Sequence, residues 1–109
     1  MRRPALALIL LALPGCFTAE PDFNSPVPGA RNAAIVEAAA SRDSSAVPDL
    51  VRMLESDDPA ARLLAIGTLE RLTGQTLGYD YSDPPGRREP AVRAWRDWVA
   101  EQRQSPRGR

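Results

Sequence analysis

The chain has 109 residues, which is enough for one domain with a core near the lower limit of self-sufficiency. Its 14 basic residues are all Arg and balance 14 acidic residues, and the sequence contains neither His nor Lys. This balance creates no positive field that would gather phosphates, so the composition argues against nucleic acid as a partner. The single Cys cannot form an internal disulfide.

The first 16 residues have the pattern of an export signal. Arg2 and Arg3 supply a positive start, and an uninterrupted apolar run extends from Ala5 to Leu13. A helical run of this length covers about 14 Å, roughly half of the hydrocarbon core, so it is too short for a stable membrane span. The run ends in Leu-Pro-Gly-Cys at 13–16, which resembles the lipobox of bacterial lipoproteins.

This resemblance implies that residues 1–15 are removed as a lipoprotein signal peptide and that Cys16 carries lipid. The protein is then exported and anchored to a membrane, facing the periplasm or the cell exterior. Phe17, in place of Asp, favours the outer membrane in bacteria of the enterobacterial type, whereas Pro14 departs from the usual small residue. The alternative, an ordinary signal with an unrelated Cys, lacks a nearby Ala-x-Ala site. Residues 16–27 are expected to be a flexible tether.

An internal repeat follows the tether. Residues 28–35, Pro-Gly-Ala-Arg-Asn-Ala-Ala-Ile, align without gaps with residues 59–66, Pro-Ala-Ala-Arg-Leu-Leu-Ala-Ile, at an offset of 31. A third Pro-x-x-Arg, at 90–93, falls at the same offset again. The match between 28–35 and 59–66 is too extensive to arise easily by chance, whereas the segment 90–93 shares only two residues with them.

The repeated positions have the chemistry of a helix start. Pro28 and Pro59 suit the first helical position, where the N–H would lack a partner in any case. Asp58 suits the N-cap, which accepts free amide hydrogens. Arg31, Arg62 and Arg93 are expected to bond carboxylates or loop carbonyls between repeats.

Apolar periodicity and short polar links predict an all-α fold of about four antiparallel helices, at 28–40, 46–55, 59–73 and 90–102. The last helix is placed near Pro90 because a Pro in its third turn would cost about 3 kcal/mol. The apolar arc of 59–73 includes Leu63 and Leu64 and is wide, as in a helix covered on two sides. The core is expected to include Leu50, Leu54, Ile66 and Leu69.

The middle of the chain resembles a HEAT repeat, including the HEAT-like type of phycobilisome lyases. The resemblance is carried by residues 46–54, by the Asp-Asp-Pro-Ala-Ala-Arg of 57–62 and by the apolar positions that follow. The resemblance covers one full repeat, 46–73, and the second helix of a preceding one at 28–40. It implies a short α-solenoid over residues 28–103, before a disordered tail at 104–109. Such a motif specifies a fold and says little about function.

The last part of the chain departs from the repeat and carries four aromatic residues, Tyr79, Tyr81, Trp95 and Trp98. They either form a partner-binding groove or cap the exposed end of the solenoid. Asp80 and Asp83 lie among Gly and Pro residues, where turn formation is favoured over Ca²⁺ binding because too few oxygen ligands cluster there.

The missing residue types argue against an enzyme. Without His or Lys there is no Ser-His-Asp triad, imidazole ligand, Schiff base or P-loop amine. We therefore expect no catalytic residue, cofactor, metal or small-molecule substrate. The sequence favours a membrane-anchored protein-binding or scaffolding module at the bacterial cell envelope. The alternatives are a small structural or stress-related lipoprotein without a dedicated partner and, more remotely, an accessory subunit of an enzyme.

Overall fold

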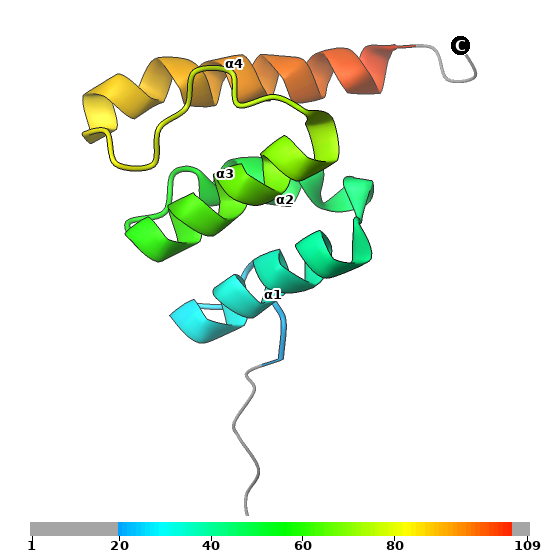
Figure 1. Ribbon diagram of the computed structural model, residues 1–109, viewed down its shortest axis with the longest axis vertical. Coiled ribbons are helices and arrows are strands. Elements are labelled where there is room, and N and C mark those ends of the chain that lie inside the picture. Colours follow the sequence, from blue (N-terminus) through cyan, green and yellow to red (C-terminus); the bar gives the residue numbers. More distant parts are fainter. Residues whose placement is uncertain (1–19, 106–109) are drawn as a thin grey trace, which may run out of the picture.

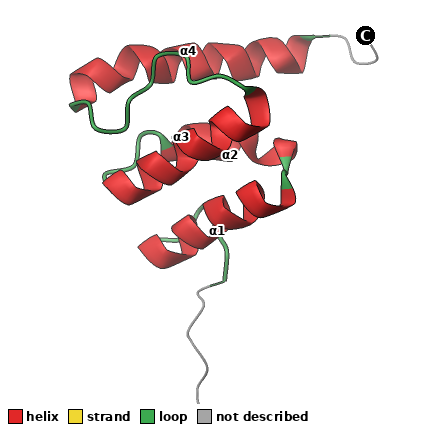
Figure 2. Ribbon diagram, viewed as in Figure 1, coloured by secondary structure: helices red, strands yellow, loops and turns green. Residues whose placement is uncertain are grey.

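The computed structural model describes residues 20–105, and within them the fold is all-helical, without strands (Figures 1 and 2). The elements in chain order are α1 (Pro28–Ser41), the 3-10 turn η1 (Ser44–Ala46), α2 (Val47–Met53), α3 (Pro59–Thr73) and α4 (Pro85–Gln104). The expected all-α class is confirmed for this part of the chain. The signal segment 1–15, Cys16 and residues 106–109 of the expected tail lie outside the described residues.

α1 and α3 begin at the two repeated prolines, as the sequence predicts. Asp58 caps α3 through its side chain, which accepts the N–H of Ala60 at 2.9 Å. The C-cap residue after α3 is Gly74, whose φ of 76° lies in the left-handed region that glycine adopts without strain. The C-cap residue after α1, Arg42, has the same conformation, with φ 52°.

α2 is the shortest of the four α-helices, and η1 leads directly into it. Asp43 opens η1 by accepting the N–H of Ser45 at 3.0 Å. Pro48 lies in the first turn of α2, where its missing N–H breaks no helical bond. The apolar residues spaced at i, i+3, i+4 and i+7 are all buried, as the pattern predicts: Val47, Leu50, Val51 and Leu54.

The expected start of the last helix was wrong. α4 begins at Pro85, and Pro90 lies inside it. The first turn is fixed by Pro84, whose carbonyl accepts the N–H groups of Arg87 at 2.9 Å and Arg88 at 3.1 Å. Pro90 therefore removes only one bond, to the carbonyl of exposed Gly86, which is open to water. α4 also runs one residue past the expected domain boundary at 103.

One core holds the helices together: α1 packs on α3, and α2 packs on both α3 and α4. The expected core residues are confirmed, since Leu50, Leu54 and Leu69 are fully buried and Ile66 is 8% exposed. Leu63 and Leu64 differ from the expectation, because they are 47% and 36% exposed. α3 is therefore not covered on both sides along its whole length.

The helix directions differ from a simple antiparallel series. In the view of Figure 1, α1, α3 and α4 all run from left to right along the chain. The loop of residues 74–84 returns the chain from the end of α3 to the start of α4 (Figure 1).

The segment before α1 is attached to the helices. The N–H of Asp22 donates to the carbonyl of Ala30 at 3.0 Å, and Arg52 donates to the side-chain oxygen of Asn24 at 3.0 Å. Phe23 packs against the core and is partly buried. Residues 20–27 were expected to belong to a flexible tether, but they are bonded to the helical domain. Each of these contacts offsets part of the entropy lost when the segment is ordered.

Candidate functional site

Two of the four aromatic side chains are buried between the 74–84 loop and the helices. Trp95 is fully buried and its indole N–H donates to the carbonyl of Thr76 at 2.9 Å. Tyr79 is 6% exposed and its hydroxyl donates to the carbonyl of Leu54 at 2.6 Å. Both polar groups are thus satisfied, as buried indole and phenol groups require. Neither ring offers an open face to a ligand.

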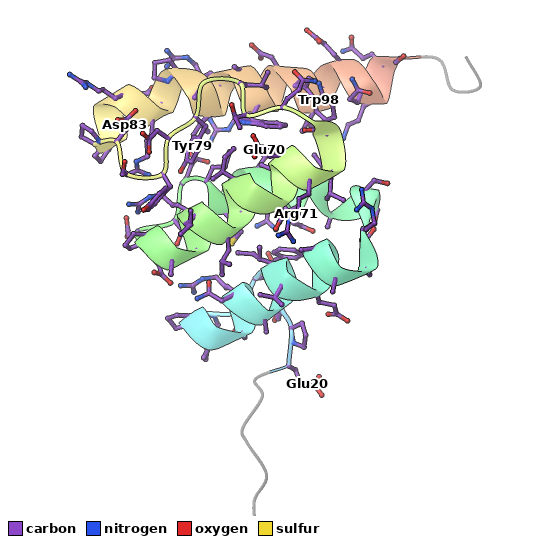
Figure 3. The ribbon with its side chains drawn as sticks, viewed as in Figure 1. Glu20, Glu70, Arg71, Tyr79, Asp83 and Trp98 are labelled. Carbon is purple, nitrogen blue, oxygen red and sulfur yellow. The ribbon has the colours of Figure 1, made fainter. Side chains whose placement is uncertain are left out.

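The other two aromatics lie at the edge of the same cluster. The rings of Trp95 and Trp98 meet edge to face, with centroids 5.7 Å apart. Trp98 is half-buried between α4 and the rest of the molecule, as Figure 3 shows. Tyr81 is also half-buried, and its carbonyl accepts the Nε–H of Arg62 at 3.1 Å. The structure therefore brings the four aromatics into one region but leaves only Trp98 and Tyr81 partly accessible.

The two repeated arginines make the same contact. Arg31 donates from Nη1 to the carbonyl of Ser25 at 2.8 Å, and Arg62 donates from Nη1 to the carbonyl of Ser56, also at 2.8 Å. Both bonds reach a loop carbonyl, one of the acceptors expected from the sequence. Arg93 does not follow them, because it pairs with Glu89 at 2.8 Å on the exposed surface of α4.

The matching hydrogen bonds of the two repeated segments also include residues before the prolines, which the sequence alignment missed. The Oγ of Ser25 accepts the N–H of Val27 at 3.0 Å, and the Oγ of Ser56 accepts the N–H of Asp58 at 3.1 Å. In addition, the N–H of Ser25 donates to Asp22, as that of Ser56 donates to Met53. The signal was the pair of serines, which lie three residues before each repeated proline at the same offset.

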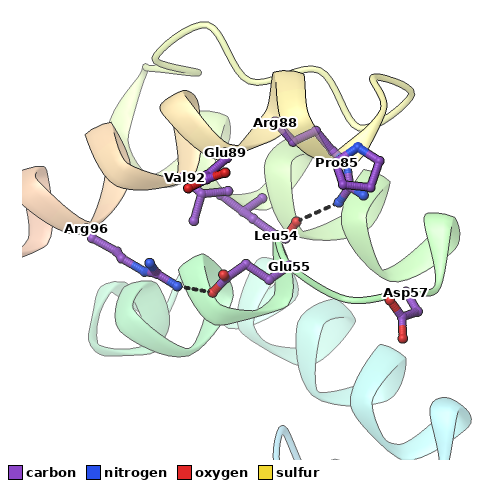
Figure 4. A pocket seen from close by; sticks show the side chains of 8 residues that line it. All are labelled: Leu54, Glu55, Asp57, Pro85, Arg88, Glu89, Val92 and Arg96. Atoms are coloured by element: carbon purple, nitrogen blue, oxygen red, sulfur yellow. Dashed lines mark hydrogen bonds and ion pairs between the residues drawn. The ribbon is translucent and has the colours of Figure 1, made fainter.

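A pocket of about 310 Å³ lies between the end of α2 and the start of α4 (Figure 4). Arg88 enters it and donates to the carbonyls of Asp83 at 2.9 Å and Leu54 at 3.4 Å. Arg96 forms an ion pair with Glu55 across it. Both arginines already have partners in the protein, and the acidic Asp57 and Glu89 also line the pocket. The pocket is thus lined by side chains of both charges, and its two arginines are already bonded to other groups of the protein.

Asp80 organises a turn. Its Oδ1 accepts the hydroxyl of Ser82 at 2.6 Å and the backbone N–H of Ser82 at 2.9 Å. These hydrogen bonds, the side-chain one foremost, hold the pKa of the Asp80 carboxyl below its usual 3.8. The N–H of Asp83 closes the turn on the Asp80 carbonyl at 3.2 Å, as turn formation predicts. Among residues 20–105, no three His, Cys, Asp or Glu side chains gather in a way that could hold a metal ion.

Three large aliphatic side chains are exposed on α1 and α3, and they are named together as the exposed aliphatic surface. They are Val36, 53% exposed, with Leu63 and Leu64 at 47% and 36%. Asn32 of α1 donates to the Asp58 carboxylate at the start of α3, at 3.4 Å, and so marks where the two helices meet. Val36 lies one turn beyond Asn32 and hence on the same side of α1. The sequence reasoning assigned the two leucines to a covered face and did not identify this surface.

Comparison with protein-family models, curated proteins and solved structures found no match to this chain. Each helix between residues 20 and 105 is too short or too polar to cross a bilayer.

Proposed function

We propose that this chain is a lipoprotein, anchored through Cys16, whose HEAT-like helical domain serves as a protein-binding or scaffolding module at the bacterial cell envelope. The domain faces the periplasm or the cell exterior, and it performs no catalysis. The anchor is supported by the lipobox-like Leu-Pro-Gly-Cys at 13–16, which follows a positive start and an apolar run.

The solenoid architecture is supported by the matched bonds of the repeat. The contacts of Ser25 and Arg31 recur at Ser56 and Arg62, with the same donors and acceptors at an offset of 31. In addition, α1 and α3, which contain these arginines in their first turns, pack side by side and run in the same direction (Figure 1). Stacking of equivalent helices is the arrangement by which repeat proteins bury a continuous core.

Binding of a protein is supported chiefly by the exposed aliphatic surface of Val36, Leu63 and Leu64. Single exposed apolar residues are normal, so this support comes from Leu63 and Leu64 being exposed on one helix, with Val36 exposed on the helix packed against it. Leu63 and Leu64 are adjacent on α3, and Gly67, one turn later, is exposed and leaves the helix backbone open to a partner.

The test is the double variant Leu63→Gln with Leu64→Gln, which keeps helix propensity and removes the apolar surface. The matched control is Ala100→Gln, at an exposed position on α4. Each form is purified with its lipid from native envelope in mild detergent, and the co-purifying proteins are quantified by mass spectrometry. We expect a defined set to be lost from the double variant alone, while its melting temperature equals that of the control. Equal sets in all forms would contradict binding through this surface.

The alternative, a structural lipoprotein without a dedicated partner, is favoured by one observation. Trp95 and Tyr79 are buried and hydrogen-bonded within the chain, as expected if the aromatics cap the array. In that case the double Gln variant should retain every interaction of the parent, and variants of the aromatics should change stability without changing any interaction.

A further inference from the structure

The distance between the anchor and the folded domain is short. Residues 20–27 are bonded to the helices through Asp22 and Asn24, so the ordered domain begins close to Glu20. Between Cys16 and Glu20 the chain has four residue steps, which span at most about 14 Å even when fully extended. This limit depends only on covalent geometry. It is little more than the diameter of one helix.

Two exposed acidic residues, Glu20 and Asp22, lie next to this attachment point, and an exposed apolar stretch follows them. Glu20 lies beyond α1, at the end of the molecule opposite α4 (Figure 3). Close to it in the chain are three consecutive exposed residues, Pro26, Val27 and Pro28, of which Val27 is 53% exposed. At the opposite end, α4 exposes several charged residues, among them Glu89, Arg93 and Asp97.

We propose that the Pro26-Val27-Pro28 surface rests on the membrane in which the Cys16 lipid is inserted, with α4 directed away from the bilayer. This inference rests on the proposed lipid anchor. A headgroup layer is roughly 5–7 Å thick, so an anchor of at most about 14 Å holds the α1 end of the domain at or near the headgroups. Small apolar side chains and prolines suit this boundary, since they gain by leaving water and prolines bring no N–H to be desolvated.

The occupant is thus a lipid surface and not a second protein. A partner as thick as one helix would fill the whole space that the anchor leaves between this surface and the bilayer. The aliphatic surface of Val36, Leu63 and Leu64, on α1 and α3, stays available for a protein. The two surfaces therefore have different partners on the same small domain.

The test uses the full, acylated chain with a single added thiol, because Cys16 is blocked by its lipid. Val27→Cys is labelled with an environment-sensitive fluorophore, and Leu63→Cys and Ala100→Cys are the controls, each at an exposed position. The proteins are reconstituted into vesicles of phosphatidylethanolamine and phosphatidylglycerol that contain a lipid with a quencher on its headgroup. We expect strong quenching and a blue shift at position 27, weaker quenching at 63 and none at 100.

A second variant inserts a Gly-Ser linker of about 15 residues between Ala19 and Glu20, which lengthens the mean reach by about 20 Å. It should remain vesicle-bound while quenching at position 27 falls toward that at position 100. Equal quenching at all three positions, or none at 27 in protein that sediments with the vesicles, would overturn the membrane contact and leave the anchor intact. Protein that fails to sediment would overturn the anchor itself, and the contact with it.

Discussion

The carbonyl oxygen of Leu54 joins three segments of the chain. It lies at the end of α2, where backbone carbonyls receive no N–H from within the helix and need donors from elsewhere. The hydroxyl of Tyr79 donates to it at 2.6 Å, and the guanidinium of Arg88 approaches it at 3.4 Å. The 74–84 loop and the start of α4 are thus both attached to the same atom of α2.

Removing this hydroxyl should weaken the fold. Tyr79→Phe keeps the buried ring but leaves the Leu54 carbonyl with only the long contact from Arg88. We expect the free energy of unfolding to fall by about 1–2 kcal/mol, the usual effect of leaving a buried acceptor poorly satisfied. Urea denaturation of residues 17–109 measures it. Ser82→Ala is the control, since that hydroxyl forms its bond on the exposed surface.

The same residue gives the fold a dependence on alkaline pH. Burial raises the pKa of the Tyr79 hydroxyl above its usual 10.0, because phenolate would lose its hydration, and the nearby Arg88 and Arg62 oppose this only in part. The unfolded chain therefore loses this proton first. The stabilisation is complete below pH 10.0 and declines as the pH rises from there toward the raised folded value. Melting temperatures should show a steeper alkaline decline in the parent than in Tyr79→Phe.

Among the elements, α4 shows how a local rule is overridden by tertiary contacts. Pro90 discourages a helix that starts before it, yet α4 starts at Pro85. Arg88 offsets the cost, because it bonds Asp83 behind it and reaches Leu54 on α2. These partners are distant in the sequence or depend on the path of the loop, so periodicity alone cannot reveal them.

Replacing Pro90 tests where the helix begins. With Pro90 inside α4, Pro90→Ala restores an N–H for the Gly86 carbonyl and should stabilise the domain. The gain should be roughly 1–2 kcal/mol, less than the full helix penalty of Pro because Pro also restricts the unfolded chain. If the helix instead began at Pro90, the same substitution would be neutral or destabilising. Urea denaturation distinguishes the two results, and Arg93→Ala, at an exposed position of the same helix, is the matched control.

The two tryptophans of α4 should contribute unequally. Trp95 is fully buried, so Trp95→Ala should cost about 3–5 kcal/mol and leave the domain close to unfolding. Trp98 is only half-buried, and Trp98→Ala should cost about 1–2 kcal/mol. Thermal melts give the comparison, and Trp95→Phe, which keeps most of the packing, provides a folded variant at the same position. Equal losses at the two positions would contradict the unequal burial of the two rings.

How far the sequence predicted these elements depended on how local each signal was. The bounds of α3 followed from Asp58, Pro59 and Gly74, which act within the helix or beside it. The core residues of α2 followed from their spacing. The exposure of Leu63 and Leu64 could not be foreseen, because it depends on how the other helices pack around α3. The two bonds of the loop to α2 and α4, through Tyr79 and Trp95, join residues that no periodicity relates.

At the scale of the whole molecule, the offset of 31 can be followed to residues before α1. The matched turn of residues 22–25 corresponds to the end of α2, and the offset of 31 relates the start of α2 at Val47 to Cys16. Pro21 occupies the place of Arg52 and opposes a helix there. The proposed lipid is therefore attached where the first helix of the first repeat would start, which accounts for the small number of residues between the anchor and the domain.

This arrangement makes Cys16 the residue on which the location of the protein depends. Cys16→Ser removes the acylated thiol and should release the protein from the membrane fraction or leave it unprocessed, with residues 1–15 still attached. Several acyl chains bind a bilayer almost irreversibly, whereas the Pro26-Val27-Pro28 surface alone buries too little apolar area to replace them. Intact mass and membrane partitioning are measured together, and Pro14→Ala, which restores the usual small residue, is the control. Unchanged mass and partitioning in Cys16→Ser would show that the Cys is incidental to an ordinary signal.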